Sequence, residues 1–182
     1  MTYYGAKEIA ASFRNVRKNT LTVAEDIPEE KYSFRPAPDT RSVAQTLIHI
    51  SNVHRFQLII HRDSKLKTLA GFDFMSFMGP MAAEEQKAFT KAEIVQRLRH
   101  GGEEFAAWVE TLSEDFLGEV VSMPPGGQPP SRTRFDMIIS VKEHEMHHRG
   151  QLMLVERMLG ITPHLTRDMQ ARMAQMQAAA SK

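Results

Sequence analysis

Two histidines four residues apart are the side chains of this sequence best placed to do chemistry. His144 and His148 lie in the run KEHEMHHRGQL at residues 142–152. In a helix this spacing turns the second imidazole by about 40° from the first and places it one turn further on, so both rings can bind one metal ion. Apolar residues fall on the same side of this predicted helix, so the pair points into the core. Two buried imidazoles without partners would each cost about 1 to 3 kcal/mol, which favours metal ligation.

A third histidine, on a different predicted helix, completes a candidate site. His49 is the remaining histidine whose helical phase matches an apolar stripe. Three neutral imidazoles, from His49, His144 and His148, can hold a divalent ion and leave a position open to water, as in catalytic sites. Gln151 lies about 20° from His144 in helical projection. We therefore expect Gln151 to contact the bound group or a histidine N–H.

Alternatives remain for this site. His147 lies about 60° from His144 on the other side and could replace His148 as the ligand. The three histidines could also be packed core residues that hold no metal. Of the other histidines, His54 and His61 are interpreted as interface or surface residues, and His100 and His164 as solvated ones. The charged residues predicted on the outer side of the last long helix are Lys142, Glu145, Arg149, Glu156 and Arg157.

Composition limits the classes of function. With no cysteine, the chain has neither disulfides nor thiolate ligands, so a metal must be bound by His, Asp, Glu or water. The 23 basic and 22 acidic side chains give a net charge of +1, which does not favour nucleic acid or an anionic membrane as a partner. No apolar run approaches the roughly 20 residues that span a bilayer. We expect a soluble, cytoplasmic protein.

The site must be positioned by four long helices, predicted at residues 7–25, 42–62, 90–111 and 135–159. Their apolar residues recur at helical spacing. Ser42 with Gln45, and Thr90 with Glu93, have the spacing of capping boxes at helix starts. Gly101 and Gly102 mark a weakness or a point of close packing in the third helix.

The connections between these helices differ in character. Residues 63–90 suggest a loop with short helical pieces that forms a packed cover, and residues 122–134 are rich in Pro and Gly. Residues 166–179 could form a short terminal helix. No segment shows sustained strand alternation. These features predict an all-α four-helix bundle with a long crossover connection, as one domain over residues 1–182 with a C-terminal extension at 161–182.

Two motifs resemble one known family. YSFRPAPDTRSVAQTLIHI, at Tyr32 to Ile50, and HEMHHRGQL, at His144 to Leu152, resemble those of the DinB-like (YfiT-type) bacterial metal-binding four-helix bundles. The resemblance implies the same ligands that helical phase selects, a divalent ion such as zinc or nickel, and frequent homodimers. Relatives include thiol-dependent S-transferases and isomerases that use small thiols, and proteins regarded as hydrolases.

The leading hypothesis is a metal-dependent enzyme of the S-transferase or hydrolase type. The ion would activate a water or a low-molecular-weight thiol for attack on a small-molecule substrate. No inward acidic residue is obvious near the three histidines, which favours thiol activation over hydrolysis. The alternative hypothesis is a non-catalytic, dimeric metal-binding module that serves in a stress response or binds a ligand.

Overall fold

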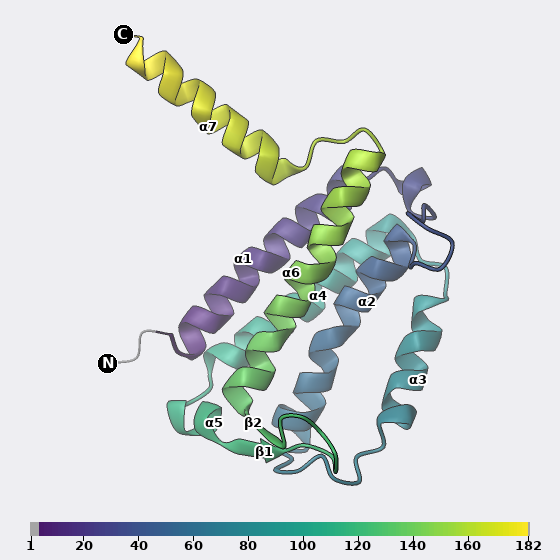
Figure 1. The fold of residues 1–182 in the computed structure, drawn as a ribbon, viewed down its shortest axis with the longest axis vertical. Helices are drawn as coiled ribbons and strands as arrows, with labels where there is room; N and C mark the ends of the chain where they lie inside the picture. Colours follow the sequence, from purple (N-terminus) through teal and green to yellow (C-terminus); the bar gives the residue numbers. More distant parts are fainter. Residues whose placement is uncertain (1–3, 182) are drawn as a thin grey trace.

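The computed structural model describes residues 4–181 and has a helical bundle as its main body (Figure 1). Residues 1–3 and 182, which fall within the predicted bounds 1–182 and 161–182, lie outside the described residues. The bundle helices are α1 (Ala6–Asp26), α2 (Val43–Gln57), α4 (Lys91–Glu110) and α6 (Arg134–Met158). The remaining elements are η1 (Glu29–Lys31), η2 (Leu58–Asp63), α3 (Phe74–Glu85), α5 (Glu114–Gly118), β1 (Val120–Ser122), β2 (Ser131–Thr133) and α7 (His164–Ala180). The predicted all-α bundle is confirmed.

Helices that follow one another in the bundle are not all packed side by side. Helix α1 contacts α4 and α6, and α2 contacts the same two helices, so α1 and α2 lie on one diagonal of the bundle and α4 and α6 on the other. The chain therefore crosses the end of the bundle between α1 and α2, and again between α4 and α6. The expected long crossover connection is the one from α2 to α4, in which α3 runs back along α2 (Figure 1). The arrangement also brings α2 against α6, the two helices that carry the three histidines.

Local sequence explains where these helices begin. The Ser42 hydroxyl accepts from the Gln45 amide at 3.2 Å, and the Gln45 side chain accepts from the Ser42 amide at 3.0 Å, so the capping box is formed. Thr90 and Glu93 form the second box. Thr133 caps α6 by accepting from the Asp136 amide at 3.1 Å. Each cap satisfies an amide that the first helical turn leaves unpaired.

Two connections differ from the prediction. Residues 74–85 form one continuous helix, α3, that packs along α2 and includes Pro80, where only short helical pieces were expected. The segment is a cover, as predicted. The Pro/Gly-rich connection contains an antiparallel pair, β1 and β2, in which Val121 pairs with Arg132. Strands of three residues are too short to show alternation in the sequence.

The prediction of a charged outer face on α6 is wrong at two positions. Glu145 is buried and accepts from Arg17 Nε and Nη2 of α1, each at 2.9 Å. Glu156 is fully buried. Helix α6 packs against α1 as well as α2, so it has two covered faces. The interpretation of the sequence assumed that only one face of this helix is buried. Arg149 also faces α1 and donates to the Val16 carbonyl at 3.4 Å.

Three histidines predicted to lie at the surface, at an interface or in solvent are buried. His54 lies between α2 and α4, where its ring faces Gly101. His61, in η2, bonds Gln57 at 2.9 Å and Arg134 at 2.7 Å. His164 is buried at the start of α7, whereas His100 is exposed as expected. Over residues 4–181, no helix is long and apolar enough to cross a membrane.

Candidate metal centre

The structure brings the three predicted histidines together. His49 projects from α2, and His144 and His148 project from successive turns of α6. One ring nitrogen from each lies within 4.8 Å of the others. The ring centroids are 4.5 to 4.9 Å apart, and the Nε2 atoms of His49 and His144 are separated by 3.1 Å. His148 is 9% exposed and the other two are half-buried, so a cation here would be largely shielded from bulk water.

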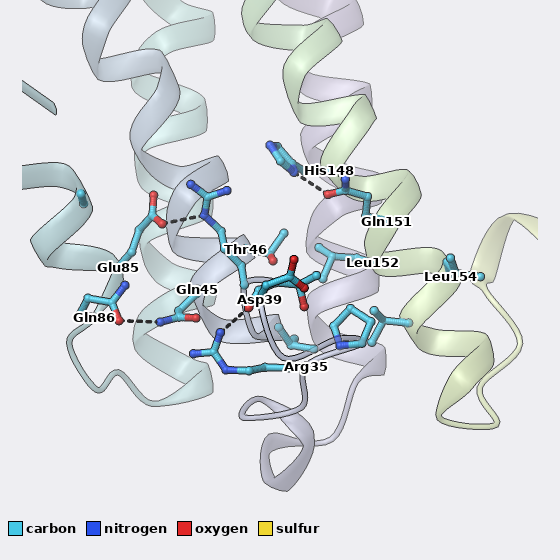
Figure 2. Close-up of a pocket in the computed structure, with 16 residues that line it drawn as sticks. Arg35, Asp39, Gln45, Thr46, Glu85, Gln86, His148, Gln151, Leu152 and Leu154 are labelled. Carbon is cyan, nitrogen blue, oxygen red and sulfur yellow. Dashed lines mark hydrogen bonds and ion pairs between the residues drawn. The ribbon is translucent and has the colours of Figure 1, made fainter. Parts of the chain in front are cut away.

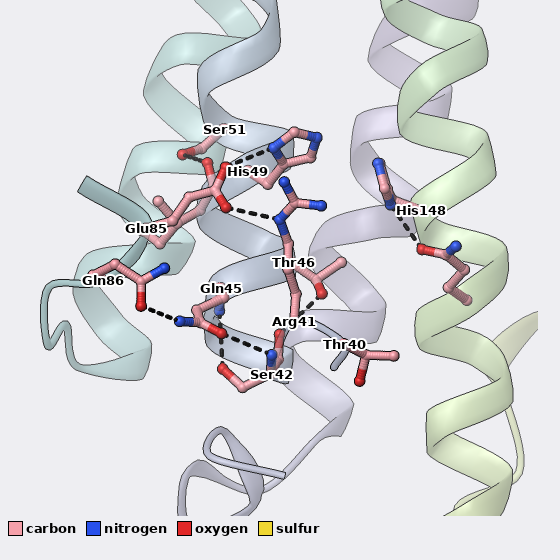
Figure 3. Close-up of polar contacts among 12 residues, drawn as sticks. Thr40, Arg41, Ser42, Gln45, Thr46, His49, Ser51, Glu85, Gln86 and His148 are labelled. Atoms are coloured by element: carbon pink, nitrogen blue, oxygen red, sulfur yellow. Dashed lines mark hydrogen bonds and ion pairs between the residues drawn. The ribbon is translucent and has the colours of Figure 1, made fainter. Parts of the chain in front are cut away.

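A carboxylate fixes the orientation of His49. Its Nδ1 lies 2.7 Å from Glu85 Oε1, and because an ionised carboxylate only accepts, Nδ1 carries the proton (Figure 3). In this orientation Nε2 points toward the centre of the cluster, where an unprotonated Nε2 would be a metal ligand. Glu85 Oε2 in turn accepts from Arg41 Nε at 2.7 Å. A carboxylate that orients a ligating histidine is a common second partner at metal sites.

His148 is held in the same way by an amide. Its Nδ1 lies 2.7 Å from Gln151 Oε1, which leaves Nε2 free to face the cluster (Figure 2). This is the N–H contact predicted for Gln151. Burial lowers the pKa of His148, and it lowers that of His144 to about 4 with the help of the neighbouring histidines and Arg41. Both rings are therefore neutral near pH 7, the state in which imidazole binds metal.

The donor atoms fit a cation. The Nε2 of His49 faces the Nε2 of His144 at 3.1 Å. A His144 proton between them would satisfy that pair alone and would leave the Nε2 of His148 outside the bond. Buried His144 Nδ1 has no partner among residues 4–181. One divalent ion would instead accept lone pairs from all three rings, so the residues present suit the implied metal.

His147 lies on the exposed side of α6. Its Nε2 is 3.1 Å from Gln151 Nε2, and it is not part of the three-histidine cluster. The geometry therefore favours His148 over His147 as the second ligand from α6.

Glu85 and Arg41 are functional-site residues that sequence reasoning missed. The expectation that no acidic residue lies near the histidines is wrong, because Glu85 is only 9% exposed and bonds His49 directly. Glu85 comes from the last turn of α3, in the segment interpreted as mostly loop, so it had no helical phase to indicate its direction. Arg41 precedes the Ser42 cap in an irregular connection, where periodicity carries no signal either.

A cleft of ≈ 740 Å³ opens beside the cluster (Figure 2). It lies between the connection that leads into α2, the end of α3 and the face of α6. His148 and Gln151 line it from α6, and Glu85 lines it from α3. Leu152 and Val155 contribute an apolar wall. A small molecule in this cleft could reach a group bound by the histidines.

Comparison with known proteins decides the family. The family model described as the DinB superfamily matches residues 12–152. The chain belongs to the DinB superfamily. The match includes α2, which carries His49, and the part of α6 that carries His144 and His148. It ends before α7. The predicted family resemblance is confirmed.

Individual DinB relatives are distant in sequence but close in fold. The uncharacterized protein YjoA of Bacillus subtilis (strain 168) is 23% identical over 160 residues, which cover 86% of this chain and 92% of that protein. The crystal structure of YjoA, described there as a DinB-like protein, matches this structure with a TM-score of 0.62. The two chains are 22% identical, and the match covers 85% of this chain and 93% of that one. YfiT from Bacillus subtilis, described as a probable metal-dependent hydrolase with an unusual four-helix bundle topology, has a TM-score of 0.67 and 13% identity, covering 89% and 91% of the two chains.

Proposed function

We propose that this DinB protein binds one divalent ion, zinc or nickel, through His49, His144 and His148 and uses it as a metal-dependent enzyme. The observation that carries the proposal is the convergence of three ring nitrogens within 4.8 Å, two of them oriented by Glu85 and Gln151. The description of YfiT as a probable metal-dependent hydrolase supports the same class. A bound ion would supply a Lewis acid that makes water or a thiol nucleophilic near neutral pH.

The reaction we propose is transfer to a thiol or hydrolysis of a small electrophile in the cleft. Both oxygens of Glu85 are engaged, one by His49 and one by Arg41, so this carboxylate positions a ligand and is not free to take a proton from a nucleophile. A low-molecular-weight thiol, which ionises more readily than water, needs no such base. This favours the thiol-dependent S-transferase type, with hydrolysis as the second outcome of the test.

Metal content is the first test. Protein purified without an affinity tag and incubated with zinc or nickel should retain about one equivalent after gel filtration. His148→Ala should abolish this binding, whereas His147→Ala, which removes the neighbouring exposed imidazole, should leave it intact. Less than about a tenth of an equivalent in the unmodified protein would reject the metal site and leave the histidines as packed residues.

Turnover is the second test. Zinc-loaded protein should accelerate the reaction of a small thiol with an electrophile such as 1-chloro-2,4-dinitrobenzene, or the hydrolysis of a small ester, and His148→Ala should remove that rate. Metal binding without turnover in either the thiol reaction or the ester hydrolysis would instead support a non-catalytic metal-binding or ligand-binding module.

A further inference from the structure

The guanidinium of Arg41 has an unused edge beside the three histidines. Its Nε donates to Glu85 Oε2 at 2.7 Å, which fixes the direction of the side chain. Among residues 4–181, its two terminal nitrogens have no hydrogen-bond or ion-pair partner, and the side chain is 44% exposed. Figure 3 shows Arg41 extending upward into the space between His49 and His148. Four N–H donors are therefore presented to the cleft next to the candidate metal position.

Most other polar side chains that line the cleft already have partners. Gln45 bonds the Ser42 amide at 3.0 Å and Gln86 at 2.9 Å. Thr46 donates to the Ser42 carbonyl at 2.9 Å, and Gln151 bonds both His147 and His148. Arg35 donates to the Thr40 carbonyl. The terminal edge of Arg41 is thus the donor group nearest the histidines that is free to bind a ligand.

Charge favours an anion on this edge. The positive charges of Arg35 and Arg41 in the cleft are balanced by the negative charges of Asp39 and Glu85, so the lining side chains have a net formal charge of zero. A divalent ion on three neutral imidazoles would then add two positive charges next to Arg41 that no lining carboxylate neutralises. A planar carboxylate matches the paired N–H groups of a guanidinium, because both of its oxygens can accept in parallel.

We infer that the cleft binds small molecules that carry a carboxylate, and that Arg41 is the specificity-determining residue that holds it. The inference rests on the proposed function, since the reacting group of the same molecule would occupy the open metal position. One carboxylate, Glu85, separates Arg41 from His49, so the anionic group of the ligand lies close to its reacting atom. Leu152 and Val155 provide an apolar wall for the rest of the molecule.

A matched pair of probes tests the inference. We would titrate zinc-loaded protein by calorimetry with 3-mercaptopropionate and with its neutral amide, which has the same thiol and nearly the same shape. The acid should bind at least ten-fold more tightly, as expected for a charge-assisted bidentate contact. Arg41→Met should bring the two affinities within about two-fold. Arg41→Lys should retain part of the difference, because lysine keeps the charge but lacks the paired N–H groups of a guanidinium.

Arg55→Met is the control variant. Arg55 is similarly exposed and pairs with Glu84 at 3.1 Å, one residue from Glu85, but it does not line the cleft. Its removal should leave the preference for the acid unchanged. Equal affinity of the unmodified protein for acid and amide would overturn the inference, as would a preference that survives Arg41→Met. Stronger competition by methylphosphonate than by acetate would overturn the assignment to a carboxylate.

The zinc affinity of each variant keeps this result separate from the proposed function. If zinc binds normally and the acid has no advantage, the carboxylate site fails while the metal site stands. If zinc does not bind at all, the proposed function fails, and the same titration on metal-free protein tests Arg41 by itself. Loss of acid preference in Arg41→Met without zinc would then still support the anion site.

Discussion

At the scale of single residues, the candidate site depends on proton positions as much as on distances. Glu85 can only accept a hydrogen bond, so it forces the proton of His49 onto Nδ1 and leaves Nε2 as a ligand atom. Gln151 Oε1 does the same for His148. A ring held in one tautomer and one orientation loses less entropy when it binds metal than a ring that must first rotate.

Replacing Glu85 should therefore weaken metal binding without removing a ligand. Glu85→Gln keeps the size of the side chain but removes the charge that polarises His49, and losses of 10- to 100-fold in affinity are typical of such changes. The control is Glu84→Gln, which removes a neighbouring carboxylate that bonds Arg55 and Arg97. Competition titration with a zinc-binding dye measures both, and equal affinities in the two variants would contradict the role given to Glu85.

Glu156 is a buried acid that the site does not use. Both of its carboxylate oxygens are buried without a partner among the described residues. Burial, helped by Asp26 and opposed by Arg167 and Arg157, raises the pKa of Glu156 to about 7. The unfolded chain releases this proton near pH 4.5, so the contribution of Glu156 to stability falls as pH rises from about 4.5 to 7 and stays low above that.

Glu156→Gln should remove this penalty. We expect the variant to be more stable than the unmodified protein by about 2 to 3 kcal/mol at pH 8 and by little at pH 4.5. Urea denaturation of metal-free protein at several pH values measures the difference. Stability curves that run parallel across this range would show that folding does not raise the pKa of Glu156.

At the scale of helices, close packing of α4 against α2 depends on a residue without a side chain. A Cβ at Gly101 would lie 2.6 Å from His54 Nε2 and 2.7 Å from Cε1, closer than Cβ atoms come to their neighbours in real structures. His54 is 2% exposed, so its ring is enclosed by the protein and cannot simply swing out into solvent. The close-packing interpretation of the Gly101 position is therefore the one that the structure supports.

Gly101→Ala should destabilise the bundle even though alanine is the better helix former. Overpacking of this kind typically costs about 1 to 3 kcal/mol, more than the roughly 1 kcal/mol gained from helix propensity. Gly150→Ala, in α6, is the control, because nothing lies within 4 Å of the added Cβ. It should leave stability unchanged or raise it. Urea denaturation compares the two, and similar effects would refute the steric argument.

Helical periodicity predicted elements well because each bundle helix buries a continuous apolar stripe, and capping residues such as Ser42 and Thr90 located their starts. Its two wrong placements on α6 have one cause. Periodicity assigns a single inward direction, whereas α6 is covered on two sides, so Glu145 and Glu156 were placed in solvent. The three histidines were found because they lie on regular helices. Arg41 was missed because it lies in an irregular connection, and Glu85 because its helix, α3, was interpreted as a loop with short helical pieces.

At the scale of the whole molecule, exposed apolar side chains gather at the end of α6 and along α7. They are Leu154, Met158, Leu165, Met169, Met173 and Met176. Figure 1 shows α7 projecting away from the bundle. An exposed apolar stripe on an isolated helix is a common feature of self-association.

The homodimer expected from the sequence stays a prediction, which sedimentation velocity tests. Met169→Glu with Met173→Glu should produce a monomer, and an unchanged species would exclude this surface.

The candidate metal centre should not depend on α7. The family match ends at residue 152, and the described polar contacts between α7 and the rest of the chain involve only its first turn, through His164, Thr166 and Arg167. A chain that ends at His164 keeps the buried imidazole and all groups around the three histidines.

We expect this shortened chain to bind zinc with an affinity within two-fold of the full-length protein and to melt within about 5 °C of it. Competition titration and thermal denaturation measure the two properties. Because the shortening removes the exposed methionines of α7 but no part of the cleft, a change in oligomeric state with unchanged zinc affinity would assign α7 to assembly. A loss of zinc binding would instead mean that a second copy supports the site, since the chain's own α7 does not reach it.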